Sequence, residues 1–160
     1  MADSSTSNRR KFLVIVDDTP ECQKALRFAW RRAKNTGGGL ALLRTVSPVD
    51  FQQWLSVEEK MREEAQTEAE ELLRSLAGKV HADSGILPEL VVRQGEAKQV
   101  ILQLIEEDPG IRVLVLGAGT SADGPGPLVS MLVGKMAGQM HVPITVVPGN
   151  LSDEQLDELT

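Results

Sequence analysis

Ile111-Arg-Val-Leu-Val-Leu-Gly117-Ala-Gly-Thr-Ser-Ala-Asp-Gly-Pro-Gly-Pro127 is the stretch from which the fold can be argued. It begins as a short apolar run rich in β-branched residues, which predicts a buried strand, and continues as a loop of Gly, Ser, Thr, Asp and Pro. A helical pattern starts at Leu128. In open α/β sheets this order places backbone N–H groups in front of anionic ligands, so the loop is the main candidate site. Similar loops also join strands to helices in sheets that bind no ligand.

The rest of the chain repeats the alternation of strand and helix. Apolar runs predict further strands at 12–16, 40–46, 87–92 and 143–147, as in a parallel sheet. Apolar stripes predict helices over 20–36, 56–80, 97–107 and 128–140. Thr19 and Pro20 suit the cap and first position of the first helix, and Ser56-Val-Glu-Glu59 has the spacing of a capping box.

The alternation predicts one α/β domain over residues 11–149, with a parallel five-stranded sheet and helices on both faces. A disordered leader (1–10) precedes it and an acidic, solubilising tail (150–160) follows. Two strand orders are common for such sheets, 3-2-1-4-5 and 2-1-3-4-5. We favour 3-2-1-4-5, because it makes neighbours of the strands followed by Asp17-Asp18 and by Gly117, the two strand ends richest in functional groups.

Composition excludes several classes of function. The 160-residue chain has a formal net charge of −6 and 3% aromatic residues, which gives no electrostatic footprint for nucleic acid or an anionic membrane. Its single cysteine, Cys22, lies on an apolar stripe and is expected to be a core residue, so neither an internal disulfide nor a cysteine metal cluster is expected. The N-terminus lacks a secretory signal, which makes the cytoplasm the expected location.

Three catalytic or signalling motifs are matched only in part. Asp17-Asp18 is similar to the acidic pair of receiver domains, but the Asp and Lys that such domains need after strands 3 and 5 are missing, and Asp18 is expected to favour the helix dipole instead. Gly134-Lys135 lacks the rest of a phosphate loop, and Gly119–Asp123 lacks the last glycine of a nucleophile elbow. We therefore expect no conventional enzyme and no metal site.

Over residues 11–148 the sequence resembles the universal stress protein family. The resemblance rests on five segments in order, Val14-Ile-Val-Asp17-Asp-Thr-Pro-Glu-Cys-Gln-Lys-Ala-Leu26, Leu42-Leu-Arg-Thr-Val46, Val91-Val-Arg-Gln-Gly95, Val113-Leu-Val-Leu-Gly117 and Val142-Pro-Ile-Thr-Val-Val147. It implies the order 3-2-1-4-5 and a homodimer through the last strand, whose residues here are Ile144, Thr145, Val146 and Val147.

In one branch of that family, the resemblance also implies ATP or AMP in the crevice between strands 1 and 4. The residue at Asp17 then lies near adenine, Val46 bonds the base through its backbone, and the phosphates sit in a Gly-x-x-Gly, nine residues, Gly-Ser/Thr motif. Without a gap, only Gly117 of this chain fits. Thr120, Ser130 and Met131 replace the other three motif residues.

The altered loop leaves two functions open. Gly119, Gly124 and Gly126 allow close backbone approach, and Thr120 and Ser130 carry hydroxyls. Pro125 and Pro127 offer no N–H, and no Lys or Arg is expected in the crevice, so bound Mg²⁺ would have to offset the phosphate charge. We therefore expect either a stress-response protein that binds ATP or AMP, with slow hydrolysis left open, or a nucleotide-independent protein-interaction module.

Overall fold

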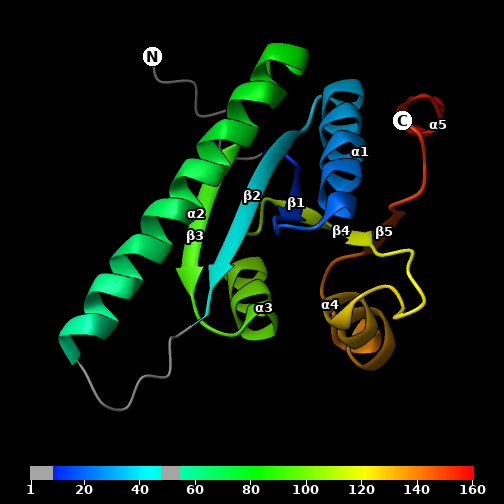
Figure 1. The fold of residues 1–160 in the computed structure, drawn as a ribbon. Helices are drawn as coiled ribbons and strands as arrows, with labels where there is room; N and C mark the ends of the chain where they lie inside the picture. The colour runs from blue at the N-terminus through cyan, green and yellow to red at the C-terminus, as the bar shows by residue number, and fades with distance from the viewer. Residues whose placement is uncertain (1–8, 48–54) are drawn as a thin grey trace.

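The sheet is parallel throughout and has the predicted strand order. The computed structural model describes residues 9–47 and 55–160, and within these ranges the order is β3-β2-β1-β4-β5 (Figure 1). The strands are β1 (Lys11–Ile15), β2 (Gly39–Val46), β3 (Glu89–Gln94), β4 (Ile111–Ala118) and β5 (Ile144–Pro148). The predicted α/β class and the order 3-2-1-4-5 are confirmed.

β1 lies at the centre of the sheet between β2 and β4. Val14 pairs with Leu42 on one side and with Val115 on the other. Because both pairings are parallel, the carboxyl ends of β1 and β4 share one rim of the sheet. The alternative order 2-1-3-4-5, which separates strands 1 and 4, is excluded.

Helices cover both faces of the sheet. They are α1 (Pro20–Thr36), α2 (Leu55–Ser84), α3 (Ala97–Glu107), α4 (Pro127–Val129), η2 (Ser130–Lys135), η3 (Ala137–Gln139) and α5 (Asp153–Leu159). α1, α2 and α5 pack on the face that carries Val14 and Val16, and α3, α4 and η2 pack on the face that carries Leu13 and Ile15. Alternate side chains of β1 therefore serve two separate cores, as expected for a strand buried on both faces.

α1 begins and ends much as the sequence predicts. Pro20 takes its first position, and Gly37 ends it in the left-handed conformation with φ of 69°. Thr19 occupies the cap position, but its side chain makes no cap hydrogen bond, because its hydroxyl bonds the Asp17 carboxylate instead. The predicted capping role of the Thr19 side chain is therefore wrong.

The predicted helix over 128–140 is also wrong in its geometry. α4 is a single turn, η2 is a π-helix and η3 is a 3₁₀ turn. The Met136 amide donates to the Met131 carbonyl five residues back at 3.0 Å, and Gly134 and Gly138 weaken a regular α-helix at this point. The other predicted elements differ from the observed ones by a few residues at their ends.

The predictions for Cys22, for the capping box at Ser56 and for the leader can be compared with the structure. Cys22 is a core residue, 3% exposed, and burial raises the pKa of its thiol to about 11. α2 already includes Ser56, and the side chains of residues 55–58 lie outside the described set, so the capping box has no structural account. Residues 1–8 of the leader are likewise outside it. None of the described helices is both long and apolar enough to cross a membrane.

The C-terminal segment is a docked helix, although the sequence predicts a solubilising tail. Ser152 and Gln155 form a reciprocal capping box at the start of α5, and Leu156 is completely buried against the α1 face. Arg27 donates two hydrogen bonds of 2.9 Å to Asp157, which lower the pKa of that carboxyl. The acidic residues of α5 thus face basic residues of α1. The sequence did not predict this helix, because the segment is amphipathic over only two turns.

Two leucines of α5 give a matched test of this docking. Leu156→Ala should reduce the free energy of unfolding by about 2–5 kcal/mol, since it empties a buried position. Leu159→Ala, on the same helix but 60% exposed, should change it by less than about 0.5 kcal/mol. Urea unfolding followed by circular dichroism measures both, and equal effects would contradict the docked helix.

Candidate functional site

Most of the predicted loop residues gather around one hollow at the carboxyl rim of the sheet. This glycine-loop hollow has a volume of about 670 Å³ and lies between the first turn of α1 and the loop after β4. Five predicted residues line it, Gly119, Thr120, Gly124, Gly126 and Ser130. Six further residues complete the lining, Pro20, Glu21, Ser121, Asp123, Pro127 and Gly149.

Gly117 is covered by α1 and does not line the hollow. A Cβ atom at Gly117 would lie 2.5 Å from the carbonyl oxygen of Glu21 and 3.1 Å from its Cγ. A Cβ at Gly149, after β5, would lie 2.8 Å from the Cβ of Glu21. These distances are too short for any side chain, so both glycines are needed for the first turn of α1 to rest on the ends of β4 and β5.

The charges that line the glycine-loop hollow are negative. The Glu21 carboxylate reaches the loop, with its Oε1 3.3 Å from the position of a Cβ on Gly119. Asp123 stands on the loop itself, and neither Lys nor Arg is among the described residues that line the hollow. A phosphate placed here would meet two carboxylates without a compensating basic side chain.

The loop also uses its own amides. The Gly119 N–H donates to the Pro125 carbonyl at 3.0 Å, and the Gly124 N–H donates to the Ser121 carbonyl at 3.1 Å. Gly124 and Gly126 have φ of 93° and 109°, values that L side chains rarely adopt. The glycines therefore let the loop fold back on itself, and two amides that a phosphate-binding loop would offer to a ligand are already bonded.

Val46 lies at a second hollow. This β2-end hollow, of about 410 Å³, is lined by Asp18, Arg44, Thr45, Val46, Ser47, Ala65, Glu68, Ala69 and Leu72. The Val46 carbonyl accepts a hydrogen bond from Gly95 at 3.0 Å, and Arg44 spans the ends of β1 and β2 by bonding both the Val16 carbonyl and Asp18. No residue is shared between the β2-end hollow and the glycine-loop hollow.

The two aspartates after β1 serve the local turn and the neighbouring strand. Asp17 Oδ1 accepts hydrogen bonds from the Thr19 amide, at 2.9 Å, and from the Thr19 hydroxyl. Asp18 pairs with Arg44 at 3.0 Å, whereas the sequence suggests a role at the helix dipole, and Glu21 is the acid in the first turn of α1. Across the described residues, no cluster of three or more His, Cys, Asp or Glu could hold a metal ion.

Comparison with known proteins accounts for this architecture. A model of the universal stress protein family matches residues 8–148. The chain belongs to that family. α5 lies beyond the matched residues, and a search of curated protein sequences finds no match.

Solved universal stress proteins share the fold at low sequence identity. UspA from Lactobacillus plantarum is 20% identical, with a TM-score of 0.74 over 88% of this chain and 98% of that chain. A universal stress protein in complex with cAMP is 16% identical, with a TM-score of 0.62 over 88% and 98%. A family member from Arabidopsis thaliana with AMP bound is 18% identical, with a TM-score of 0.56 over 91% and 94%.

Glu21 is the residue of this rim that sequence reasoning missed. The sequence gives it no role beyond its place in the segment 14–26, and a carboxylate in the first turn of a helix is favourable to the helix dipole in any protein. Its position in the sequence is the signal that could have found it. Glu21 directly follows Pro20, which takes the first position of α1, and this first turn of α1 packs on Gly117 of β4.

The close contact at Gly117 predicts a purely structural effect of its substitution. Gly117→Ala should lower the free energy of unfolding by about 1–3 kcal/mol, because the new methyl group overlaps the backbone of Glu21. Gly78→Ala in α2 is the control, since nothing lies within 4 Å of the added Cβ, and it should leave stability unchanged or raise it by up to about 1 kcal/mol. Chemical denaturation without any ligand distinguishes the two, and a Gly117→Ala protein as stable as wild type would contradict the contact.

Proposed function

We propose that this universal stress protein is a cytoplasmic stress-response protein that acts as a nucleotide-independent interaction module and not as an ATP-binding protein or an enzyme. The single observation that supports this is the acidic glycine-loop hollow, which Glu21 and Asp123 line together with Thr120 and Ser130, two positions of the phosphate motif that the family resemblance implies. Gly117, the residue that fits the family's phosphate motif, makes room for α1, and the amides of Gly119 and Gly124 are bonded within the loop.

The repulsion between a carboxylate of the hollow and a phosphate group is large enough to oppose ATP binding. Two like charges about 4 Å apart repel by about 4 kcal/mol at an effective dielectric constant of about 20. One such repulsion lowers affinity by a factor of about 10³. Mg²⁺ could offset part of it, so the test is made with the metal present.

Titration with ATP and Mg²⁺, read as the change in Tm, tests the proposal. A ligand at about 100 times its Kd would raise Tm of a domain this size by roughly 5 °C or more. The wild-type protein should show no such rise at millimolar ATP. Glu21→Gln should gain a response to ATP, because it removes one carboxylate from the hollow while keeping the shape of the side chain.

Glu106→Gln, on the exposed side of α3, is the matched control and should behave like wild type. A wild-type rise of roughly 5 °C or more would contradict the proposal. Denaturing the purified protein and identifying any released nucleotide gives an independent check, for which the expected result is none.

Mononucleotide binding is the second candidate function. Solved relatives contain AMP and cAMP, which carry less phosphate charge than ATP. Asp18 and Glu68 line the β2-end hollow together with Arg44, which pairs with Asp18, so the net charge of its lining is less negative than that of the glycine-loop hollow. The same titration with AMP and cAMP decides between the candidates, since a rise with either one but not with ATP favours this second function.

We further propose a homodimer through β5, the strand that carries the predicted dimer residues. β5 pairs with β4 on one side, and within the described residues no strand pairs with its other side. The Leu114 N–H donates to the Pro143 carbonyl at 2.9 Å, and Leu114 lies opposite Ile144. By the parallel ladder pattern, Thr145 and Val147 then turn their backbone groups to β4, while Ile144 and Val146 turn theirs to the free edge. A second copy of β5 would cover that edge.

Val146→Pro should therefore release monomers, because it removes an outward N–H while leaving the pairing with β4 in place. Val92→Pro is the matched control on the opposite edge, since Gly95 donates to Val46, which lies opposite Gln94, so the backbone of Val92 also faces outward. Light scattering should give twice the chain mass of 17.4 kDa for wild type and Val92→Pro and one chain mass for Val146→Pro. Equal masses for the two variants would count against pairing through β5.

A further inference from the structure

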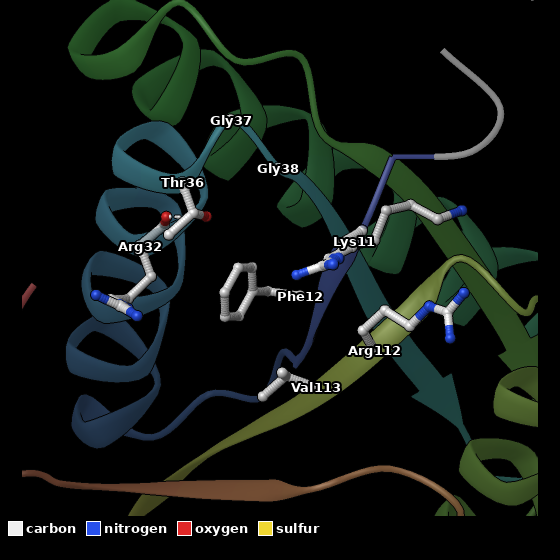
Figure 2. Close-up of a pocket in the computed structure, with 9 residues that line it drawn as sticks. Lys11, Phe12, Arg32, Thr36, Gly37, Gly38, Arg112 and Val113 are labelled. Atoms are coloured by element: carbon white, nitrogen blue, oxygen red, sulfur yellow. Dashed lines mark hydrogen bonds between the residues drawn. The ribbon is translucent and has the colours of Figure 1, made fainter. Parts of the chain in front are cut away.

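A third hollow lies at the opposite rim, where the strands begin. This arginine hollow has a volume of about 430 Å³ and is lined by Arg10, Lys11, Phe12, Arg32, Thr36, Gly37, Gly38, Arg112 and Val113. Figure 2 shows the Phe12 ring between α1, which carries Arg32 and Thr36, and β4, which carries Arg112 and Val113. The arginine hollow is therefore separated from the glycine-loop hollow by the length of the strands.

The three arginines that line the hollow differ from most other arginines of the protein. Arg10, Arg32 and Arg112 have no acidic partner among the described residues, and no Asp or Glu is among the residues that line the hollow. Five other arginines each pair with a carboxylate, namely Arg27, Arg31, Arg44, Arg74 and Arg93. In a chain of net charge −6, this hollow gathers three positive charges that no carboxylate among residues 9–47 and 55–160 pairs with.

Lys11 shows the contrast within the hollow. Its ammonium bonds Asp108 and Glu89, and although burial alone lowers the Lys11 pKa, these two carboxylates outweigh burial and raise it. Lys11 is thus a neutralised, structural cation. Arg32 and its neighbour Arg31 differ in the same way, because Arg31 pairs with Asp157 of α5, whereas Arg32 lines the hollow and has no acidic partner among the described residues.

The floor of the hollow is apolar and its rim is held by the backbone. Phe12 and Val113 are half-buried and pack against the core beneath α1. The Arg10 carbonyl accepts a hydrogen bond from Gly39 at 2.8 Å, and a Cβ on Gly38 would lie 2.8 Å from that same carbonyl. Gly38 therefore lets the turn after α1 close tightly on Arg10, which directly precedes β1, while Arg32 stands on α1 and Arg112 on β4.

We propose that the arginine hollow docks an acidic segment of a partner protein, with one apolar side chain of that segment on Phe12 and Val113 and its carboxylates on Arg10, Arg32 and Arg112. Guanidinium groups match carboxylates in a bidentate geometry, and arginine and aromatic residues are enriched in the centres of protein interfaces. The negative charge elsewhere on this protein repels such a segment, which restricts its docking to this rim. The proposal names a partner for the interaction module above and rests on that proposed function.

Fluorescence anisotropy with a labelled peptide of sequence Glu-Glu-Leu-Glu-Glu tests the docking. The wild-type protein should bind it saturably, and the Arg32→Gln, Arg112→Gln double variant should bind at least tenfold more weakly. Arg74→Gln, which removes a charge from the exposed side of α2, should bind like wild type. A peptide with Ser in place of Leu should bind more weakly than the parent peptide, because it has no apolar side chain for the floor.

Three results would overturn the proposal. They are the absence of saturable binding, equal binding by the double variant and wild type, and saturable binding of sodium tripolyphosphate that the peptide does not displace, which would assign the hollow to a small anion. Circular dichroism of the double variant confirms that it folds. The failure of this proposal can be distinguished from the failure of the proposed function. The ATP titration tests the glycine-loop hollow at the carboxyl rim, whereas the peptide tests the arginine hollow at the opposite rim, so the result of one does not change the result of the other.

Discussion

The contact between the first turn of α1 and the end of β4 determines what the carboxyl rim can do. Parallel pairing of β1 with β4 brings the chain leaving β1 directly over Gly117, and there is no space for a side chain between them. The same turn delivers the Glu21 carboxylate to the loop after β4. A glycine that resembles a ligand-binding feature in the sequence is thus explained by packing, and the packing brings a negative charge where an anionic ligand would need a positive one.

The two rims of the sheet have opposite electrostatic character. At the carboxyl rim, Glu21 and Asp123 both line the glycine-loop hollow, and loop amides are bonded within the loop. At the amino rim, Arg10, Arg32 and Arg112 line a hollow that also contains Phe12, and they have no acidic partners among the described residues. An overall charge of −6 conceals this polarity, because five of the other arginines are paired with carboxylates, Arg27 and Arg31 with Asp157 of α5. Charge that is not neutralised internally is the part available for recognition.

Much of the fold followed from local patterns. Apolar runs and helical stripes gave the order of elements, and the placement of functional groups after strands 1 and 4 favoured the correct strand order. Prediction failed where neighbours in space decide the local geometry. The segment after Pro127 became a π-helix and a 3₁₀ turn around Gly134 and Gly138, and the acidic tail became a helix because a basic, apolar face of α1 was present to receive it.

The sequence alone determined the α/β class, the family and the set of loop residues, because these depend on periodicity, composition and the order of short motifs. Only the tertiary structure decided which contacts those residues make and so what their structural roles are. Gly117 and Gly149 make room for α1, Asp17 closes a turn, and Val46 and the glycine loop line separate hollows. It also brought together Arg10, Arg32 and Arg112, which are far apart in the chain. The physical reason is that contacts and electrostatic fields depend on distance in space, which the spacing of residues along a chain does not specify.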